Sequence, residues 1–187
     1  MIPKRDYWAQ DDGTRPLGRK IAIKENLQRI YPEGNFNYVD LCCGQGDVLE
    51  HLADAFSKAS FVGVDTYNYK EDIRKLCKEK CWLVKPNLKF VLEFMQEFID
   101  KSPRFNVCSL LNSYRFFPVE NMSIEDQAIQ LEGRKQLHSW LIAKVDYFIA
   151  SLSAAHNDSY LPFKYKIIGF DKEEKYPLIL CNTKELK

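Results

Sequence analysis

An aspartate, a glycine-rich turn and a second aspartate are the part of this sequence best suited to chemistry. The segment Asp40-Leu-Cys-Cys-Gly44-Gln-Gly46-Asp47 separates a short apolar run from an amphipathic one. Glycine has no Cβ, so a turn built from it can adopt positive φ and let a ligand approach the backbone. Asp65 follows 65 − 46 = 19 residues after Gly46, a spacing typical of a carboxylate that accepts hydrogen bonds from a ribose diol. The pattern predicts a nucleotide-type cofactor.

Two features of this turn disfavour a nicotinamide dinucleotide. The dinucleotide fingerprint has a third glycine three residues after the second, and this sequence has Leu49 at that place. A carboxylate at Asp40, immediately before the turn, repels a diphosphate but attracts the ammonium group of an amino acid. The residues therefore favour an adenosyl cofactor that carries an amino-acid group.

Strands and helices are expected to alternate on both sides of the turn. Such alternation requires an α/β fold, here a doubly wound, mostly parallel seven-stranded sheet in one domain. The last two strands are joined by a charged turn and should add a terminal antiparallel hairpin. The ligand is expected at the carboxyl ends of the first strands. Apolar runs predict strands at 37–43, 59–64, 88–92, 105–111, 145–152, 163–170 and 176–181, and helical spacing predicts helices at 21–30, 47–56, 72–81, 93–101 and 123–143.

The same residues also resemble a known family. Val39-Asp-Leu-Cys-Cys-Gly-Gln-Gly-Asp-Val-Leu49, followed by Phe61-Val-Gly-Val-Asp65, resembles motif I and the acidic residue after strand two of class I S-adenosylmethionine-dependent methyltransferases. The family pattern is Asp/Glu-x-Gly-x-Gly-x-Gly. Cys42 stands in place of its first glycine, which is similar to quinone-biosynthesis members. The resemblance covers about residues 21–183 and implies a Rossmann-like methyltransferase that uses S-adenosylmethionine.

The resemblance also implies which residues hold the cofactor. Two of these residues keep a structural alternative, since Asp65 is also suited to cap a turn and Glu93 to begin a solvated helix. The resemblance assigns Asp40, Gly44 and Gly46 to the methionine moiety with Cys42 in the same turn, Asp65 to the ribose hydroxyls, Thr66 and Tyr67 to the adenine, Glu93 and Phe94 to the adenine edge, and Asn112 to the reactive methyl group.

The loops after the strands at 105–111 and 145–152 should carry the residues near the transferred methyl group. They contain Tyr114 and His156, the two candidate catalytic residues. Methyl transfer from a sulfonium is an in-line displacement, so positioning supplies much of the rate, and a base is needed only when the nucleophile must lose a proton. His156 therefore has two interpretations, a general base or an ordinary surface histidine.

The net charge of the chain indicates which class of molecule accepts the methyl group. The 187 residues include 27 Lys and Arg and 26 Asp and Glu, which gives a formal net charge of +1. This balance lacks the basic excess typical of proteins that bind nucleic acid over a large surface. We therefore expect a small-molecule acceptor. RNA methylation is the alternative, as is a domain that binds the cofactor without catalysis and serves as a subunit or regulator.

Other features of the composition bear on metal, membrane and location. The six cysteines show no Cys-x-x-Cys pair, so no metal site is expected and the thiols should be buried and reduced. No apolar run is long enough for a membrane span, and the first residues lack the apolar core of a secretory signal. A cytoplasmic protein is expected. Residues 1–20 are polar and turn-rich and are predicted to form an arm or lid before a domain at 21–187.

Overall fold

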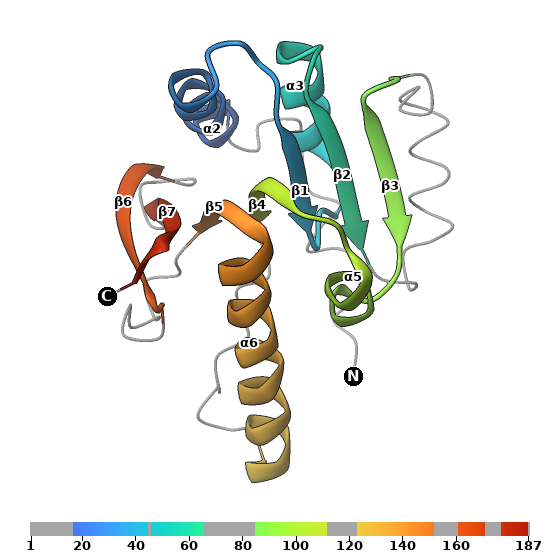
Figure 1. Cartoon of the computed structure of the whole chain (residues 1–187), viewed down its shortest axis with the longest axis vertical. Coiled ribbons are helices and arrows are strands. Elements are labelled where there is room, and N and C mark those ends of the chain that lie inside the picture. Colours follow the sequence, from blue (N-terminus) through green and yellow to red (C-terminus); the bar gives the residue numbers. More distant parts are fainter. Residues whose placement is uncertain are drawn as a thin grey trace.

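Short apolar segments of the chain pair into one seven-stranded sheet with the order β3-β2-β1-β4-β5-β7-β6, as the computed structural model shows (Figure 1). The structure describes residues 17–44, 46–65, 85–111, 123–151, 161–170 and 177–186. The strands are β1 (Asn37–Leu41), β2 (Ser60–Asp65), β3 (Leu88–Leu92), β4 (Phe105–Leu110), β5 (Val145–Ser151), β6 (Phe163–Phe170) and β7 (Pro177–Leu186).

The direction of the strands confirms the predicted fold class. The pairs from β3 through β5 are parallel, whereas β7 pairs antiparallel with both β5 and β6. The sheet is therefore mostly parallel and ends in an antiparallel hairpin. Strand β1 lies between β2 and β4, so the order of strands reverses there, and open α/β sheets bind ligands at such a point.

The register brings the sequence motifs to one edge of the sheet. Asp40 of β1 pairs with Gly63 of β2 on one side and with Ser109 of β4 on the other. Asp65 at the end of β2 pairs with Leu92 at the end of β3. Because these strands are parallel, their carboxyl ends meet at the same edge, and both aspartates lie there.

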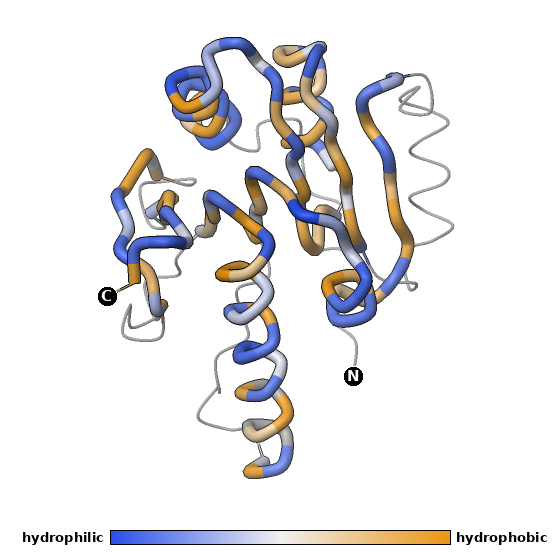
Figure 2. Tube along the Cα trace, viewed as in Figure 1, coloured by the Kyte–Doolittle hydropathy of each residue, from blue (hydrophilic) through white to orange (hydrophobic). Residues whose placement is uncertain are grey.

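Helices cover both faces of the sheet (Figure 1). Helices α2 (Leu17–Ile30) and α3 (Asp47–Ala55) pack on one face and contribute to a core cluster with the aromatic side chains of β1 and β2. Helices α5 (Met95–Lys101) and α6 (Ile124–Lys144) pack on the other face. Apolar and polar residues are mixed along α6 (Figure 2), and its buried apolar side chains, Leu137, Trp140 and Leu141, lie in its carboxyl-terminal half.

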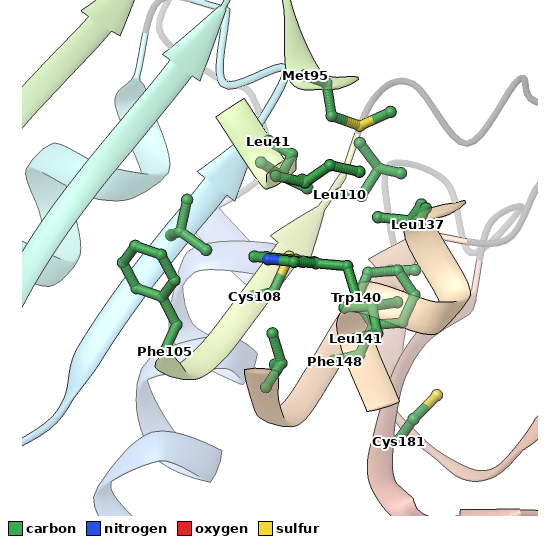
Figure 3. Close-up of a cluster of buried hydrophobic side chains, with 14 of the residues drawn as sticks. Leu41, Met95, Phe105, Cys108, Leu110, Leu137, Trp140, Leu141, Phe148 and Cys181 are labelled. Carbon is green, nitrogen blue, oxygen red and sulfur yellow. The ribbon is translucent and has the colours of Figure 1, made fainter. Parts of the chain in front are cut away.

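Trp140 of α6 lies in the core cluster between the sheet and helices α5 and α6, with its ring next to that of Phe105 (Figure 3). Its indole Nε1 donates a hydrogen bond of 2.8 Å to Ser102 Oγ, and Lys144 Nζ donates one of 2.6 Å to the Ser102 carbonyl. The buried indole thus has the hydrogen-bond partner that it needs. These contacts attach the carboxyl end of α6 to the segment before β4, at the edge opposite the aspartates.

Several element boundaries differ from the sequence expectation, among them those of α2, α5 and β7. Helix α2 begins at Leu17 rather than residue 21, and α5 begins at Met95 because Phe94 is extended (φ −66°, ψ 143°). Strand β7 continues to Leu186, beyond the predicted end at 181. Residues 182–185 of this strand are polar, so apolar periodicity missed them, yet the Thr183 hydroxyl donates a hydrogen bond to the Val145 carbonyl of β5. The predicted helix at 72–81 and residues 1–16 of the predicted arm lie outside the described residues.

Two glycines should respond in opposite ways to alanine. A Cβ on Gly63 would lie 2.7 Å from Leu49 Cδ1 and from Phe90 Cε1, so we expect Gly63→Ala to destabilise the protein by about 1–3 kcal/mol through overpacking. A Cβ on Gly133, inside α6, would lie 3.7 Å from Gln96 Nε2, so Gly133→Ala should stabilise by about 0.5–1 kcal/mol. Urea denaturation measures both. A Gly63→Ala protein as stable as the wild type would contradict the close packing of Leu49 and Phe90 around Gly63.

Candidate functional site

The turn between β1 and α3 owes its shape to three residues in the left-handed region. Cys42 has φ 57°, Gly44 has φ 56° and Gly46 has φ 71°. The Gly46 N–H donates to the Cys43 carbonyl at 3.0 Å, and the Gly46 carbonyl accepts the Glu50 N–H of α3 at 2.9 Å. Glycine adopts this conformation without a steric penalty, whereas a residue with a Cβ does so at a cost of about 1–2 kcal/mol. The two glycines therefore suit this turn, and Cys42 is strained.

Cys42 offers a direct test of this strain. At an ordinary position glycine is less stable than alanine by about 0.5–1 kcal/mol. At position 42 we expect the reverse order, with Cys42→Gly more stable than Cys42→Ala by about 1 kcal/mol, because only glycine relieves the left-handed backbone. Thermal denaturation of both variants provides the comparison, and position 133 in α6 serves as the control with the ordinary order. Alanine more stable than glycine at position 42 would show that the turn is not strained there.

Hydrogen bonds attach the turn to the neighbouring strand ends. The Cys43 N–H donates to the Val64 carbonyl at 3.0 Å, and the Gly44 N–H donates to Asp65 Oδ2 at 2.5 Å. The Asp65 carbonyl in turn accepts the Glu93 N–H at 2.9 Å. Asp65 therefore joins the turn, β2 and the end of β3. Asp65 is nearly buried, with 8% of its surface exposed. Its carboxylate stabilises the turn from the end of β2.

Asp40 lies buried at the base of the turn, 3% exposed. Its Oδ1 accepts a hydrogen bond of 2.5 Å from the Ser109 hydroxyl on β4. Burial, with a smaller contribution from the Asp65 carboxylate, raises the pKa of Asp40 to about 7, although the Ser109 hydrogen bond and the Arg19 guanidinium lower it. A carboxylate in such surroundings gains from a cation placed beside it, because it is only partly neutralised by the protein.

Arg19 and Ser109 are site residues that the sequence analysis missed. Both are buried, Arg19 in the first turns of α2 and Ser109 in β4. A polar residue within the apolar run 105–111 was a signal that could have identified Ser109. Arg19 carried no such signal, because its interaction with Asp40 depends on how α2 packs in the fold, and its segment was assigned to the arm.

Glu93 and Phe94 lie at the end of β3, beside Asp65. The Glu93 carboxylate forms an ion pair of 2.5 Å with Lys101 of α5, and this pair raises the pKa of the Lys101 ammonium. Phe94 is 50% exposed and immediately precedes α5. The Glu93 side chain thus has a partner within the protein, whereas the Phe94 ring is accessible to a ligand.

The structure brings together one part of the predicted site. Asp40, the turn and Asp65 are in contact or are joined by hydrogen bonds, and Phe94 follows the adjacent strand. Within the described ranges, no group of three or more His, Cys, Asp or Glu side chains is arranged to hold a metal ion. The remaining predicted residues, Thr66, Tyr67, Asn112, Tyr114 and His156, lie outside the described residues.

No protein-family model matches the sequence, and no curated protein matches it either. Solved structures do share its fold. The bifunctional kinase-methyltransferase WbdD matches with a TM-score of 0.70 at 20% identity, over 98% of this chain and 43% of WbdD. A hypothetical protein of Thermus thermophilus, TTHA0928, matches with a TM-score of 0.63 at 14% identity, over 92% of this chain and 90% of that protein. TrmN from Thermus thermophilus matches with a TM-score of 0.57 at 12% identity, over 86% of this chain and 48% of TrmN.

These similarities establish the type of fold. The chain has the fold of methyltransferases, with the seven-stranded, mostly parallel sheet and the terminal hairpin that the sequence predicted. It spans less than half the length of WbdD. Among the described helices, none is long and apolar enough to cross a membrane.

Proposed function

We propose that this protein is an S-adenosylmethionine-dependent methyltransferase that acts on a small-molecule acceptor. The observation that carries the proposal is the hydrogen bond between the Gly44 N–H and Asp65 Oδ2. It joins the glycine turn to the aspartate whose spacing is typical of ribose binding, at the point where the strand order reverses. The methyltransferase fold of the chain supports the same reaction class.

The residues of the turn fit the methionine end of this cofactor. A Cβ on Gly44 would meet nothing within 4 Å in the described part of the chain, so the described residues leave room for a ligand beside Gly44. The buried Asp40 carboxylate lies at the base of the turn and would attract the ammonium group of the methionine moiety. When bound, the cofactor supplies an electrophilic methyl group on its sulfonium sulfur. The task of the turn is to hold the amino-acid group so that this methyl group points to the acceptor.

The ends of β2 and β3 fit the adenosine half. Asp65 has a carboxylate at the edge of the sheet, where it would accept hydrogen bonds from the ribose hydroxyls. The exposed ring of Phe94 offers an apolar surface for the adenine. Thr66, Tyr67 and Asn112 stay predicted cofactor contacts, and Tyr114 and His156 stay candidate catalytic residues, on the strength of the sequence resemblance.

The proposed acceptor rests on charge. With a net charge of +1, the chain has little to offer a polyanion beyond local patches. Nucleic-acid affinity should therefore be weak and should fall steeply with salt. Fluorescence anisotropy with mixed RNA at physiological salt tests this point, and a tight, salt-resistant complex would move the proposal to RNA methylation.

Isothermal titration tests the cofactor. We expect S-adenosylmethionine and S-adenosylhomocysteine to bind, and NAD not to bind, because Asp40 attracts an ammonium group and repels a diphosphate. Tighter binding of NAD than of either adenosyl compound would contradict the proposal. Transfer of a radiolabelled methyl group into small-molecule fractions of a cell extract then tests catalysis. Binding without transfer to any fraction would indicate a cofactor-binding subunit instead of an enzyme.

A further inference from the structure

The hydrogen bond between Ser109 and Asp40 has a chemical consequence that the fold alone does not require. The two residues face each other on neighbouring strands, in register, and lie 69 residues apart in the chain. Ser109 is fully buried and Asp40 nearly so. The Ser109 hydroxyl donates to Asp40 Oδ1 at 2.5 Å, a short distance for a hydrogen bond between a hydroxyl and a carboxylate. A bond of this kind favours the ionised carboxylate over the neutral acid.

Several other groups surround the Asp40 carboxyl. The Arg19 guanidinium of α2 favours its charged form, and the Asp65 carboxylate of β2 disfavours it. Tyr38 on β1, Cys43 in the turn and Cys108 on β4 also interact with Asp40, and burial raises the pKa of each well above its ordinary value, so all three are neutral near pH 7. Of Asp40, Tyr38, Cys43 and Cys108, Asp40 is therefore the one whose charge changes near neutral pH.

We infer that Ser109 is a positioning residue that holds Asp40 ready to ionise for the cofactor's ammonium group, so that cofactor binding is coupled to the release of a proton from Asp40. This inference rests on the proposed function. In the empty site part of the protein carries the neutral Asp40 acid. When the ammonium group arrives, the O–H bond of that acid breaks, the proton passes to solvent, and the carboxylate keeps the electron pair and forms an ion pair with the ammonium group. Charge and atoms balance, and no other reactant is needed.

Proton release is measured directly by titration calorimetry. S-adenosylhomocysteine, which cannot donate a methyl group, is titrated into the full-length protein from pH 6 to pH 8, in pairs of buffers with different enthalpies of ionisation. We expect a buffer-dependent binding heat that corresponds to a released proton near pH 6 and that disappears towards pH 8. We also expect the affinity to rise over the same interval, because less of the carboxyl then has to lose a proton.

Variants at position 109 identify the residue responsible. Loss of the hydroxyl in Ser109→Ala should move the midpoint of the affinity profile upward by about one pH unit and weaken binding at pH 7 about five-fold, with a smaller effect at pH 8. Ser109→Thr keeps a hydroxyl and should restore the profile. Ser102→Ala is the matched control, because Ser102 is also buried and hydrogen-bonded but lies at the opposite edge of the sheet. It should leave the pH profile unchanged.

The outcomes separate this inference from the proposed function. Binding without proton release in the wild-type protein would overturn the coupling and leave the cofactor assignment in place. A loss of affinity in Ser109→Ala that is equal at pH 6 and pH 8 would reduce Ser109 to a structural residue. No binding of S-adenosylhomocysteine at any pH would overturn both. The wild-type measurement decides the coupling even where a variant does not fold.

Discussion

Asp40→Asn is expected to make the ligand-free protein more stable at pH 8 while it weakens S-adenosylhomocysteine binding by roughly 10- to 150-fold, the range for a hydrogen bond to a charged group. Asparagine removes the buried negative charge, yet its amide oxygen can still accept the hydrogen bond from the Ser109 hydroxyl. The ammonium group of the ligand would then lose its ion-pair partner. Stability and binding should therefore change in opposite directions.

The pH dependence of this stability gain has a definite sign. The pKa of Asp40 is about 7 in the folded protein and near 4 in the unfolded chain. Between these values the folded protein binds more protons, so the stability of the wild type falls as the pH rises from about 4 to 7, and the full cost is present above pH 7. The gain from Asp40→Asn should thus be small at pH 4 and on the order of 4 kcal/mol at pH 8.

Urea denaturation at pH 4 and pH 8 measures the gain, and calorimetry measures the binding. Asp54→Asn is a suitable control, because Asp54 is an exposed carboxylate that pairs with Lys85. An exposed pair contributes at most about 1 kcal/mol, and its loss should not alter binding. An Asp40→Asn protein that is less stable at pH 8 and still binds the ligand fully would show that the buried charge serves the fold and not the cofactor.

Asp65→Ala is expected to weaken S-adenosylhomocysteine binding by about 10- to 150-fold, which corresponds to 1.5–3 kcal/mol for hydrogen bonds to a charged group. Two losses combine in this variant. The ribose hydroxyls lose their acceptor, and the Gly44 N–H loses the carboxylate that fixes the turn. Asp65→Asn keeps an oxygen that can accept the Gly44 N–H, so its effect should be smaller.

A comparison of two ligands distinguishes the two roles of Asp65. Methylthioadenosine has the ribose but lacks the amino-acid group. If Asp65 also fixes the turn, Asp65→Ala should weaken S-adenosylhomocysteine binding by a larger factor than methylthioadenosine binding. Equal factors would confine Asp65 to the ribose, and unchanged affinity for both would mean that the ribose is held elsewhere. Asp146→Ala is the control, since Asp146 is a carboxylate paired with Arg104 and Asn106 at the opposite edge of the sheet.

Much of the fold was predictable because the signals are local. Apolar runs and helical spacing predicted the elements around the turn, and the alternation of the two required a parallel sheet. The predicted ends of helices and strands were wrong where a contact with a residue distant in sequence decides them. Strand β7 extends through polar residues because β5 and β6 supply its hydrogen bonds, and α5 begins late because the Glu93 N–H bonds to Asp65.

The candidate site likewise has a part that the sequence predicts and a part that depends on tertiary contacts. The sequence by itself determined the turn with Gly44 and Gly46, and the two aspartates that flank it, because backbone conformation and spacing follow from residue type and position. Only the tertiary structure decided the surroundings of those aspartates. Ser109 and Arg19 reach Asp40 from other elements, and Gly44 reaches Asp65 across the end of the sheet. Desolvation and partner charges exist only after the strands and α2 have packed, so the protonation of Asp40 is a property of the fold.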